Sequence, residues 1–195
     1  MPVRRASKDQ QGRRPLLSLT RDNSPPRCAR CASKPCSVCI VARCRFSVGE
    51  ESPRLTFPGT GGNAHLVLDR AHLENNVIAL SVNASNGTPS GIGVHVIIRD
   101  SVVSGNAVDG ILALTTAGKA PAFIVVDRTS VVDNAGTGIH ADGPRATMVL
   151  NDNVISRNGT GISALNGGQL ISFGNNKNFN NIGPEGAPTG FFSPM

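Results

Sequence analysis

The 195-residue sequence contains no tryptophan and no tyrosine, and it has only 7 phenylalanines. It therefore offers few aromatic rings that could stack on a sugar or on a nucleic-acid base. It also lacks any apolar run of the roughly 18 residues that a membrane-spanning helix needs. The basic start of the chain is followed by no apolar stretch, so no secretory signal is visible. We therefore predict no membrane span and no specific nucleic-acid partner, and the cellular compartment stays open.

Cysteine is absent from most of the chain, and positive charge is concentrated in the same part as the cysteines. All 5 cysteines and 12 of the 19 Lys and Arg residues lie in residues 1–57, which contain only 4 of the 13 Asp and Glu residues. Residues 58–195 contain 7 basic and 9 acidic side chains, so the first segment produces the net charge of +6. We call residues 1–57 the leader and predict that it is a disordered basic segment.

The cysteines of the leader form two Cys-x-x-Cys pairs and leave one cysteine over. They are Cys28, Cys31, Cys36, Cys39 and Cys44. Two such pairs could give zinc four thiolates, but the gap between them is much shorter than in common zinc sites, and no histidine lies nearby. A disulfide cluster would need an oxidising compartment. We predict no metal ligand and no cofactor, and both alternatives stay open.

The remainder of the sequence is a repeat centred on asparagine. Asn76, Asn106, Asn134 and Asn158 recur in one setting at intervals of 30, 28 and 24 residues, and Asn181 follows 23 residues later in a weaker form. Five positions around each of the first four asparagines are apolar in every repeat, whereas the 39% apolar content would make about eight of these twenty apolar by chance. The positions are Leu66, Leu68, Leu73, Leu80, Val82, Val96, Ile98, Val103, Ile111, Ala113, Ile124, Val126, Val131, Ile139, Ala141, Met148, Leu150, Ile155, Ile162 and Ala164.

The spacing inside a repeat indicates short strands separated by turns. Apolar and other residues alternate, as they do on a strand with one buried face. The asparagines and the glycines that follow them mark turns, because both tolerate left-handed backbone. A unit of 23–30 residues with three short strands and no helix is one coil of a solenoid, and stacked coils form parallel sheets. In the last repeat we place Ile171 and Phe173 inward, and Asn178 takes an apolar position.

The segment from about His65 to Asn181 resembles a right-handed parallel β-helix of the pectate-lyase-like superfamily. The phrases Asp-Ser-Val-Val-Ser-Gly-Asn at 100–106 and Gly-Thr-Gly-Ile-His-Ala at 136–141 carry the resemblance. It implies an all-β fold, a right-handed parallel β-helix of about four to five coils at residues 58–182, followed by a tail at 183–195. Complete domains of the superfamily usually have about ten coils, so we expect an N-terminally truncated member.

Stacking the coils would place equivalent side chains in columns. The repeated asparagines should form an amide ladder at one corner. Two adjacent columns should alternate in charge and oppose slipping of the coils, although catalytic carboxylates with arginine partners remain the alternative. These columns are Asp69, Arg99, Asp127 and Asn151, beside Arg70, Asp100, Arg128 and Asp152.

Two further columns should point outward and form a ridge on the solenoid. They contain His65, His95, Phe123 and Thr147, beside Val67, Ile97, Val125 and Val149. The ridge is either a solvated sheet face rich in strand-forming residues or a docking surface for another chain. Because the first coil near residues 65–69 has no recognisable cap, we expect self-association through the N-terminal edge and this ridge.

The sequence lacks the residue patterns of the enzymes that share the fold. Lyases of the superfamily use clustered aspartates for calcium and an arginine base, hydrolases use paired aspartates, and epimerases carry an Asp-Pro-His-Glu phrase. None of these occurs, and His140 with Asp142 is the only neighbouring His and Asp phrase. Their expected column neighbours offer no third partner of suitable charge. We therefore assign no catalytic residue.

The pattern favours a non-catalytic structural or binding module over an enzyme. The resemblance suggests surface or envelope association, because relatives are often exported. The alternative is a remnant of a carbohydrate-active enzyme, a lyase, hydrolase or epimerase, that acts on acidic polysaccharide. The expected partners are a polysaccharide or another protein chain.

Overall fold

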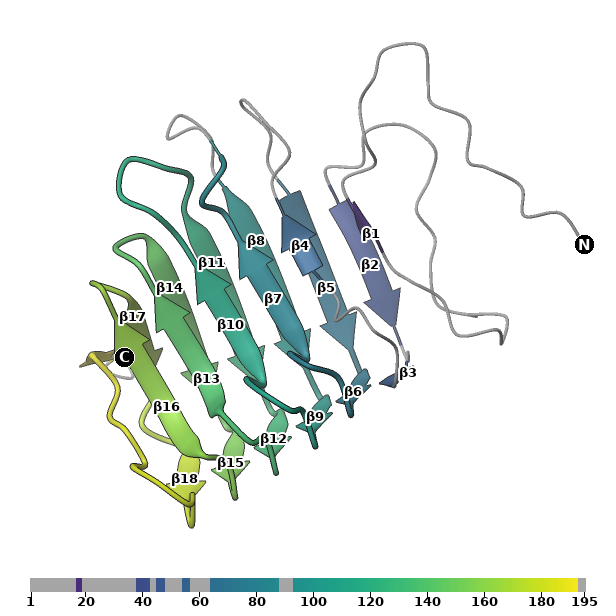
Figure 1. The fold of residues 1–195 in the computed structure, drawn as a ribbon, viewed down its shortest axis with the longest axis vertical. Coiled ribbons are helices and arrows are strands. Elements are labelled where there is room, and N and C mark those ends of the chain that lie inside the picture. Colours follow the sequence, from purple (N-terminus) through teal and green to yellow (C-terminus); the bar gives the residue numbers. More distant parts are fainter. Residues whose placement is uncertain are drawn as a thin grey trace, which may run out of the picture.

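The chain forms a parallel β-helix with three sheets that run side by side along the stack of coils (Figure 1). The computed structural model describes residues 64–87 and 93–192, and it describes the backbone of four strands at 17–18, 38–42, 45–47 and 54–56. Apart from the antiparallel pair β1 and β4, every strand pair in this part of the chain is parallel. The described residues contain no α-helix. The prediction of an all-β parallel β-helix is confirmed.

Each coil contributes one strand to each sheet, in the order sheet B, sheet C and sheet A. Sheet B contains β2 (Val38–Ala42), β5 (Ala64–Asp69), β8 (Val94–Arg99), β11 (Ala122–Asp127), β14 (Ala146–Asn151), β17 (Gln169–Ser172) and β19 (Gly190–Phe191). Sheet C contains β3 (Arg45–Ser47), β6 (His72–Glu74), β9 (Val102–Ser104), β12 (Ser130–Val132), β15 (Val154–Ser156) and β18 (Lys177–Phe179). Sheet A contains β1 (Leu17–Ser18), β4 (Arg54–Thr56), β7 (Leu80–Asn83), β10 (Ile111–Leu114), β13 (Thr137–Asp142) and β16 (Thr160–Leu165).

Three strands of the leader continue these sheets. Strand β2 pairs in parallel with β5, β3 with β6, and β4 with β7. The sheets therefore extend beyond the boundary that we placed after residue 57. Cys28, Cys31, Cys36 and Cys44 lie outside the described residues, as does the side chain of Cys39, so their roles stay predictions.

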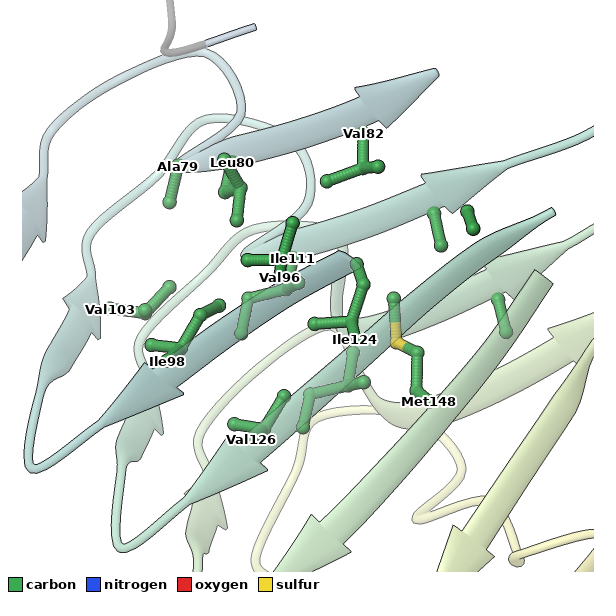
Figure 2. Packing of buried hydrophobic residues seen from close by; sticks show 14 of the residues in the cluster. Ala79, Leu80, Val82, Val96, Ile98, Val103, Ile111, Ile124, Val126 and Met148 are labelled. Atoms are coloured by element: carbon green, nitrogen blue, oxygen red, sulfur yellow. The ribbon is translucent and has the colours of Figure 1, made fainter. Parts of the chain in front are cut away.

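The core lies between the three sheets and is built from the predicted apolar positions. Nineteen of the twenty are buried, and Ala164 is partly buried against the same cluster. Figure 2 shows side chains of sheet B, such as Ile124 and Val126, directed toward those of the neighbouring sheets. Burial of one Leu, Ile or Val side chain contributes about 1.5–3 kcal/mol, so these repeated positions are the main stabilising contacts of the coil stack.

The last repeat is shifted by one residue from the position that we predicted. Leu150 pairs with Ser172, and Met148 pairs with Leu170, so Leu170 and Ser172 take the inward positions. Our inward placement of Ile171 and Phe173 is therefore wrong, and Phe173 is 45% exposed. The placement of Asn178 beside Ile155 is confirmed by the register of β15 and β18.

The predicted asparagine ladder is present at the corner between sheets C and A. The Nδ2 group of Asn106 donates to Oδ1 of Asn134 at 2.6 Å, and Asn134 donates in the same way to Asn158 at 2.8 Å. Asn158 continues the ladder to Oδ1 of Asn181 at 3.0 Å. Each of these Oδ1 atoms also accepts the main-chain N–H of the preceding asparagine. The ladder satisfies polar groups that would otherwise be costly to bury.

A second ladder, which we did not predict, lies at the corner between sheets B and C. The hydroxyl of Ser101 accepts the main-chain N–H of Ala71 at 3.0 Å, and Oδ1 of Asn153 accepts that of Thr129 at 2.9 Å. Asn176 then accepts the main-chain N–H of Asn153 at 3.0 Å. Because the residue type changes along this column, the repeat is hard to see in the sequence.

The residues before this second ladder have left-handed backbone although none is glycine. Arg70, Asp100, Arg128 and Asp152 have φ angles of 53°, 50°, 45° and 49°. A non-glycine residue seldom adopts this conformation. At each of these corners the chain passes from sheet B to sheet C within two residues, and the left-handed residue has an exposed charged side chain.

The C-terminal end of the stack is partly covered by residues 184–191. The main-chain carbonyls of Pro184 and Glu185 accept the N–H groups of Gly161 and Ile162 at 3.0 and 2.9 Å, where a further coil would otherwise pair with β16. The carboxylate of Glu185 accepts hydrogen bonds from the main-chain N–H and Nδ2 of Asn181, which ends the asparagine ladder. Strand β19 pairs with β17. Within the described residues, no helix is long and apolar enough to cross a membrane.

Candidate functional site

The charged columns that we predicted are in contact at the end of sheet B. Asp69 forms ion pairs with Arg70 at 3.0 Å and with Arg99 of the next coil at 3.1 Å. The hydrogen bond from Arg70, together with the charges of Arg70 and Arg99, holds the pKa of Asp69 below its usual value. Asp69 is therefore a fixed anion that bridges two coils.

Arg128 connects the following coils in the same way. It forms ion pairs with Asp100 of the preceding coil at 2.8 Å and with its neighbour Asp127 at 2.7 Å. The hydrogen bond from Arg128 lowers the pKa of Asp100, and the same bond with the nearby aspartates raises the pKa of Arg128. Asn151 also donates to Asp127. The predicted contacts of Asp100 and Asp127 with Arg128 are confirmed.

A third charged contact lies at the corner after sheet C, and the sequence analysis did not find it. Arg157 donates from Nε and NH2 to the two carboxylate oxygens of Asp133, at 2.6 Å each. This hydrogen bonding lowers the pKa of Asp133 and raises that of Arg157. The two residues are 24 positions apart, which equals one repeat, so the repeat spacing could have revealed the pair.

His140 has a charged partner that its column does not contain. The Nδ1 atom of His140 on β13 lies 3.0 Å from Oδ2 of Asp109, which precedes β10 in the neighbouring coil. The other carboxylate oxygen of Asp109 accepts the main-chain N–H of Thr137 at 2.8 Å. Both side chains are mostly buried, with exposed fractions of 17% and 13%. The column neighbours of His140 are uncharged, as expected, and its charged partner comes from outside the column.

The environment of His140 favours its charged form. The hydrogen bond to Asp109 and the charges of Asp109 and Asp142 raise the pKa of His140, whereas burial lowers it. The net pKa of His140 lies above its usual value. Ser163 on β16 and Leu112 on β10 are its neighbours in register. The Nε2 atom is buried and has no hydrogen-bond partner. A carboxylate-held imidazole is the arrangement of a general base, but here the nitrogen that would exchange a proton is covered.

The outward ridge on sheet B combines rings and aliphatic side chains. The ring centroids of His65 and His95 are 5.1 Å apart, and those of His95 and Phe123 are 5.7 Å apart. Ile97 is 42% exposed, whereas Val149 is only 6% exposed. The predicted ridge is therefore accessible at Ile97 but not at Val149, which is buried.

The described residues contain no cluster of three or more His, Cys, Asp or Glu side chains that could hold a metal ion. His65 and His95 form a ring pair, and His140 is held by Asp109. Comparison of the chain with models of protein families, with curated proteins and with solved structures finds no match. The structure itself therefore identifies the chain only as a parallel β-helix with stacked asparagine and charge ladders.

Proposed function

We propose that the chain is a non-catalytic structural or binding module, surface or envelope associated, built on a parallel β-helix. The observation that carries this proposal is that the outward aspartates Asp69, Asp100, Asp127 and Asp133 are all paired with arginines. The partner belongs to the same column in three cases, and that of Asp127 is its sequence neighbour Arg128. Carboxylates that cleave glycosidic bonds must be free to move protons or to attack, and carboxylates that bind calcium must face the ion. These four instead hold the coils in register.

The ridge on sheet B supports a role in binding. The tilted rings of His65, His95 and Phe123 lie in one column, beside the aliphatic side chains of Ile97 and Val125. Such a strip suits an extended partner, either a polysaccharide chain or a segment of another protein. An origin in the pectate-lyase-like superfamily stays part of this proposal.

The test is to incubate the full chain with polygalacturonate and alginate, and to measure binding and cleavage together. We expect no release of reducing ends and no unsaturated uronate. If polysaccharide is the partner, retention on the polymer should fall when Phe123 is replaced by Ala, whereas Leu165→Ala on sheet A, outside the ridge, should have no effect. Cleavage of either polymer faster than by a heat-unfolded sample would contradict the proposal that the chain is non-catalytic.

The second candidate function is a carbohydrate-active enzyme, a lyase, hydrolase or epimerase acting on acidic polysaccharide. The pair of Asp109 and His140 favours it, because a carboxylate at Nδ1 orients an imidazole for proton transfer at Nε2. This candidate requires that the buried Nε2 atom of His140 become accessible to the substrate. Its test is the same cleavage assay with Asp109→Asn and His140→Gln, since activity lost in both variants would support the enzyme.

A further inference from the structure

Two histidines stand next to each other on the outward face of sheet B. His65 on β5 and His95 on β8 are partners in register and belong to successive coils. Both side chains are partly exposed, so a small solute can reach them. Their ring centroids are 5.1 Å apart, and the ring planes are inclined by 51°, so the rings do not stack face to face.

The separation of these two rings matches that of two imidazoles bound to one metal ion. A ligating imidazole nitrogen lies about 2.0–2.1 Å from Zn²⁺, and the ring centre lies about 1.1 Å behind that nitrogen. Each ring centre is then about 3.2 Å from the ion. At the tetrahedral angle of about 109° between the two bonds, the ring centres are about 5.2 Å apart, close to the observed 5.1 Å.

The two strands already hold the histidines at this separation. Leu66 and Val96 follow them and are buried in the core, with exposed fractions of 5% and 0%, so the main chain on both strands is anchored. Binding an ion needs only rotation of the rings about their side-chain bonds, because the last torsion of histidine has broad wells. Ligands that are in place before binding lose less conformational freedom when the ion arrives.

The chemistry of the pair selects the kind of ion. Imidazole nitrogen suits Zn²⁺, Cu²⁺ and Ni²⁺, whereas Ca²⁺ and Mg²⁺ take oxygen ligands. Each imidazole has two nitrogens, so it can bind an ion through one and keep another contact at the second. Phe123 lies on the far side of His95, with the ring centroids 5.7 Å apart, and its side chain offers no ligand. The ion therefore fits between His65 and His95.

We propose that His65 and His95 bind one divalent transition-metal ion through one nitrogen of each ring, with water in the remaining positions. The bound ion connects β5 to β8 and stabilises these two coils, because it binds the folded chain in preference to the unfolded one. We predicted no metal ligand from the sequence, where the two histidines appear only as members of the outward ridge. The site goes beyond the proposed binding function and does not depend on the partner that the module binds.

The test is a Zn²⁺ titration of the full chain near neutral pH, followed through the nitrogen-15 NMR signals of the histidine rings. The chain has 4 histidines, so single His→Gln variants assign all the ring signals. Zn²⁺ should shift one ring nitrogen of His65 and one of His95 in parallel, with a dissociation constant on the order of micromolar. Mg²⁺ should shift neither. Because the signals report the rings directly, zinc bound elsewhere in the chain does not imitate the result.

The variants separate a two-histidine site from two independent rings. His65→Gln should weaken binding at His95 at least about tenfold, and His95→Gln should do the same at His65, because each removes one of two ligands. His72→Gln is the matched control, since His72 is half exposed on sheet C beside Glu74, and it should leave the dissociation constant within about twofold. Circular dichroism should show that all three variants remain folded.

Two results would overturn the metal site. One is that the ring signals of His65 and His95 do not move at about millimolar Zn²⁺. The other is that they move but each is unaffected by replacement of the other histidine, since the rings would then not share an ion. Either result would remove this site alone and leave the proposed binding module standing, because that proposal rests on the paired aspartates and not on a metal.

Discussion

The side-chain amide of Asn134 donates to Oδ1 of Asn158 at 2.8 Å, and the same oxygen accepts the main-chain N–H of Asn134 at 3.1 Å. The two asparagines are 24 residues apart and belong to successive coils. Both are buried, with exposed fractions of 1% and 0%. Oδ1 of Asn158 thus binds both the main chain and the side chain of Asn134, and it holds the two successive coils in register at this corner.

We predict that Asn134→Ala lowers the free energy of unfolding by about 2–5 kcal/mol. The substitution removes the acceptor of the main-chain N–H of Asn106 and the donor to the Val103 carbonyl, and a buried polar group without a partner costs about 1–3 kcal/mol. Urea unfolding measures the effect. Gln169→Ala, at an exposed position of β17, serves as the control and should change stability by less than about 0.5 kcal/mol. Equal effects of the two substitutions would show that the ladder does not stabilise the stack.

We predict that Ile139→Ala destabilises the chain by about 2–5 kcal/mol, because Ile139 is fully buried and the truncated side chain leaves a cavity. Leu165→Ala on the neighbouring strand is the matched control, since Leu165 is 49% exposed. Thermal unfolding of the two variants should separate them clearly. A small loss for Ile139→Ala would place this residue outside the core.

We predict that Arg99→Asp is more destabilising than Arg99→Ala. Arg99 is paired with Asp69 and stands in register with Asp127, so an aspartate at this position would face like charges on both sides. Because Arg99 is half exposed, the difference should be small at low salt, and it should shrink as salt is added. Chemical unfolding at two salt concentrations measures this. A difference that persists unchanged at high salt would contradict a charge-based role.

The pair of His140 and Asp109 predicts a pH dependence of stability. The pKa of His140 is raised in the folded chain, so its protonated form stabilises the fold fully below the unfolded value of 6.5. That contribution disappears as the pH rises through the raised folded pKa. The stability difference between the natural chain and His140→Gln should therefore decrease from pH 6 upward. A difference that is constant across this range would indicate that the ion pair does not contribute.

The repeated positions of the fold could be predicted because their residue types keep one period. Asn106, Asn134 and Asn158 are identical, and Val103, Val131 and Ile155 are interchangeable in the core, so both columns are visible in the sequence. The shift at Leu170 and Ser172 could not be predicted from this pattern. Ile171 and Phe173 have the same alternation and are more apolar, and only the pairing with β14 decides between the two registers.

The site residues were harder to predict than the fold. Asp109 is 31 residues from His140 and lies just before a strand rather than within its column, so no spacing rule connects them. The second ladder was also invisible, because Ser101, Thr129 and Asn153 have different side chains that share only the ability to accept a hydrogen bond. The second ladder could have been found by searching each column for side chains that accept a hydrogen bond, rather than for identical residues.

The most direct test of the stacked coils is a through-hydrogen-bond NMR correlation on the isotopically labelled chain. In the parallel β-helix, the main-chain nitrogen of Asn134 should couple to the side-chain Cγ of Asn158, and that of Asn106 to Cγ of Asn134, because each N–H donates to the Oδ1 on that carbon. We predict both correlations. Coupling of these nitrogens to carbonyl carbons within their own coil, with no correlation to the next asparagine, would contradict the stacked-coil structure.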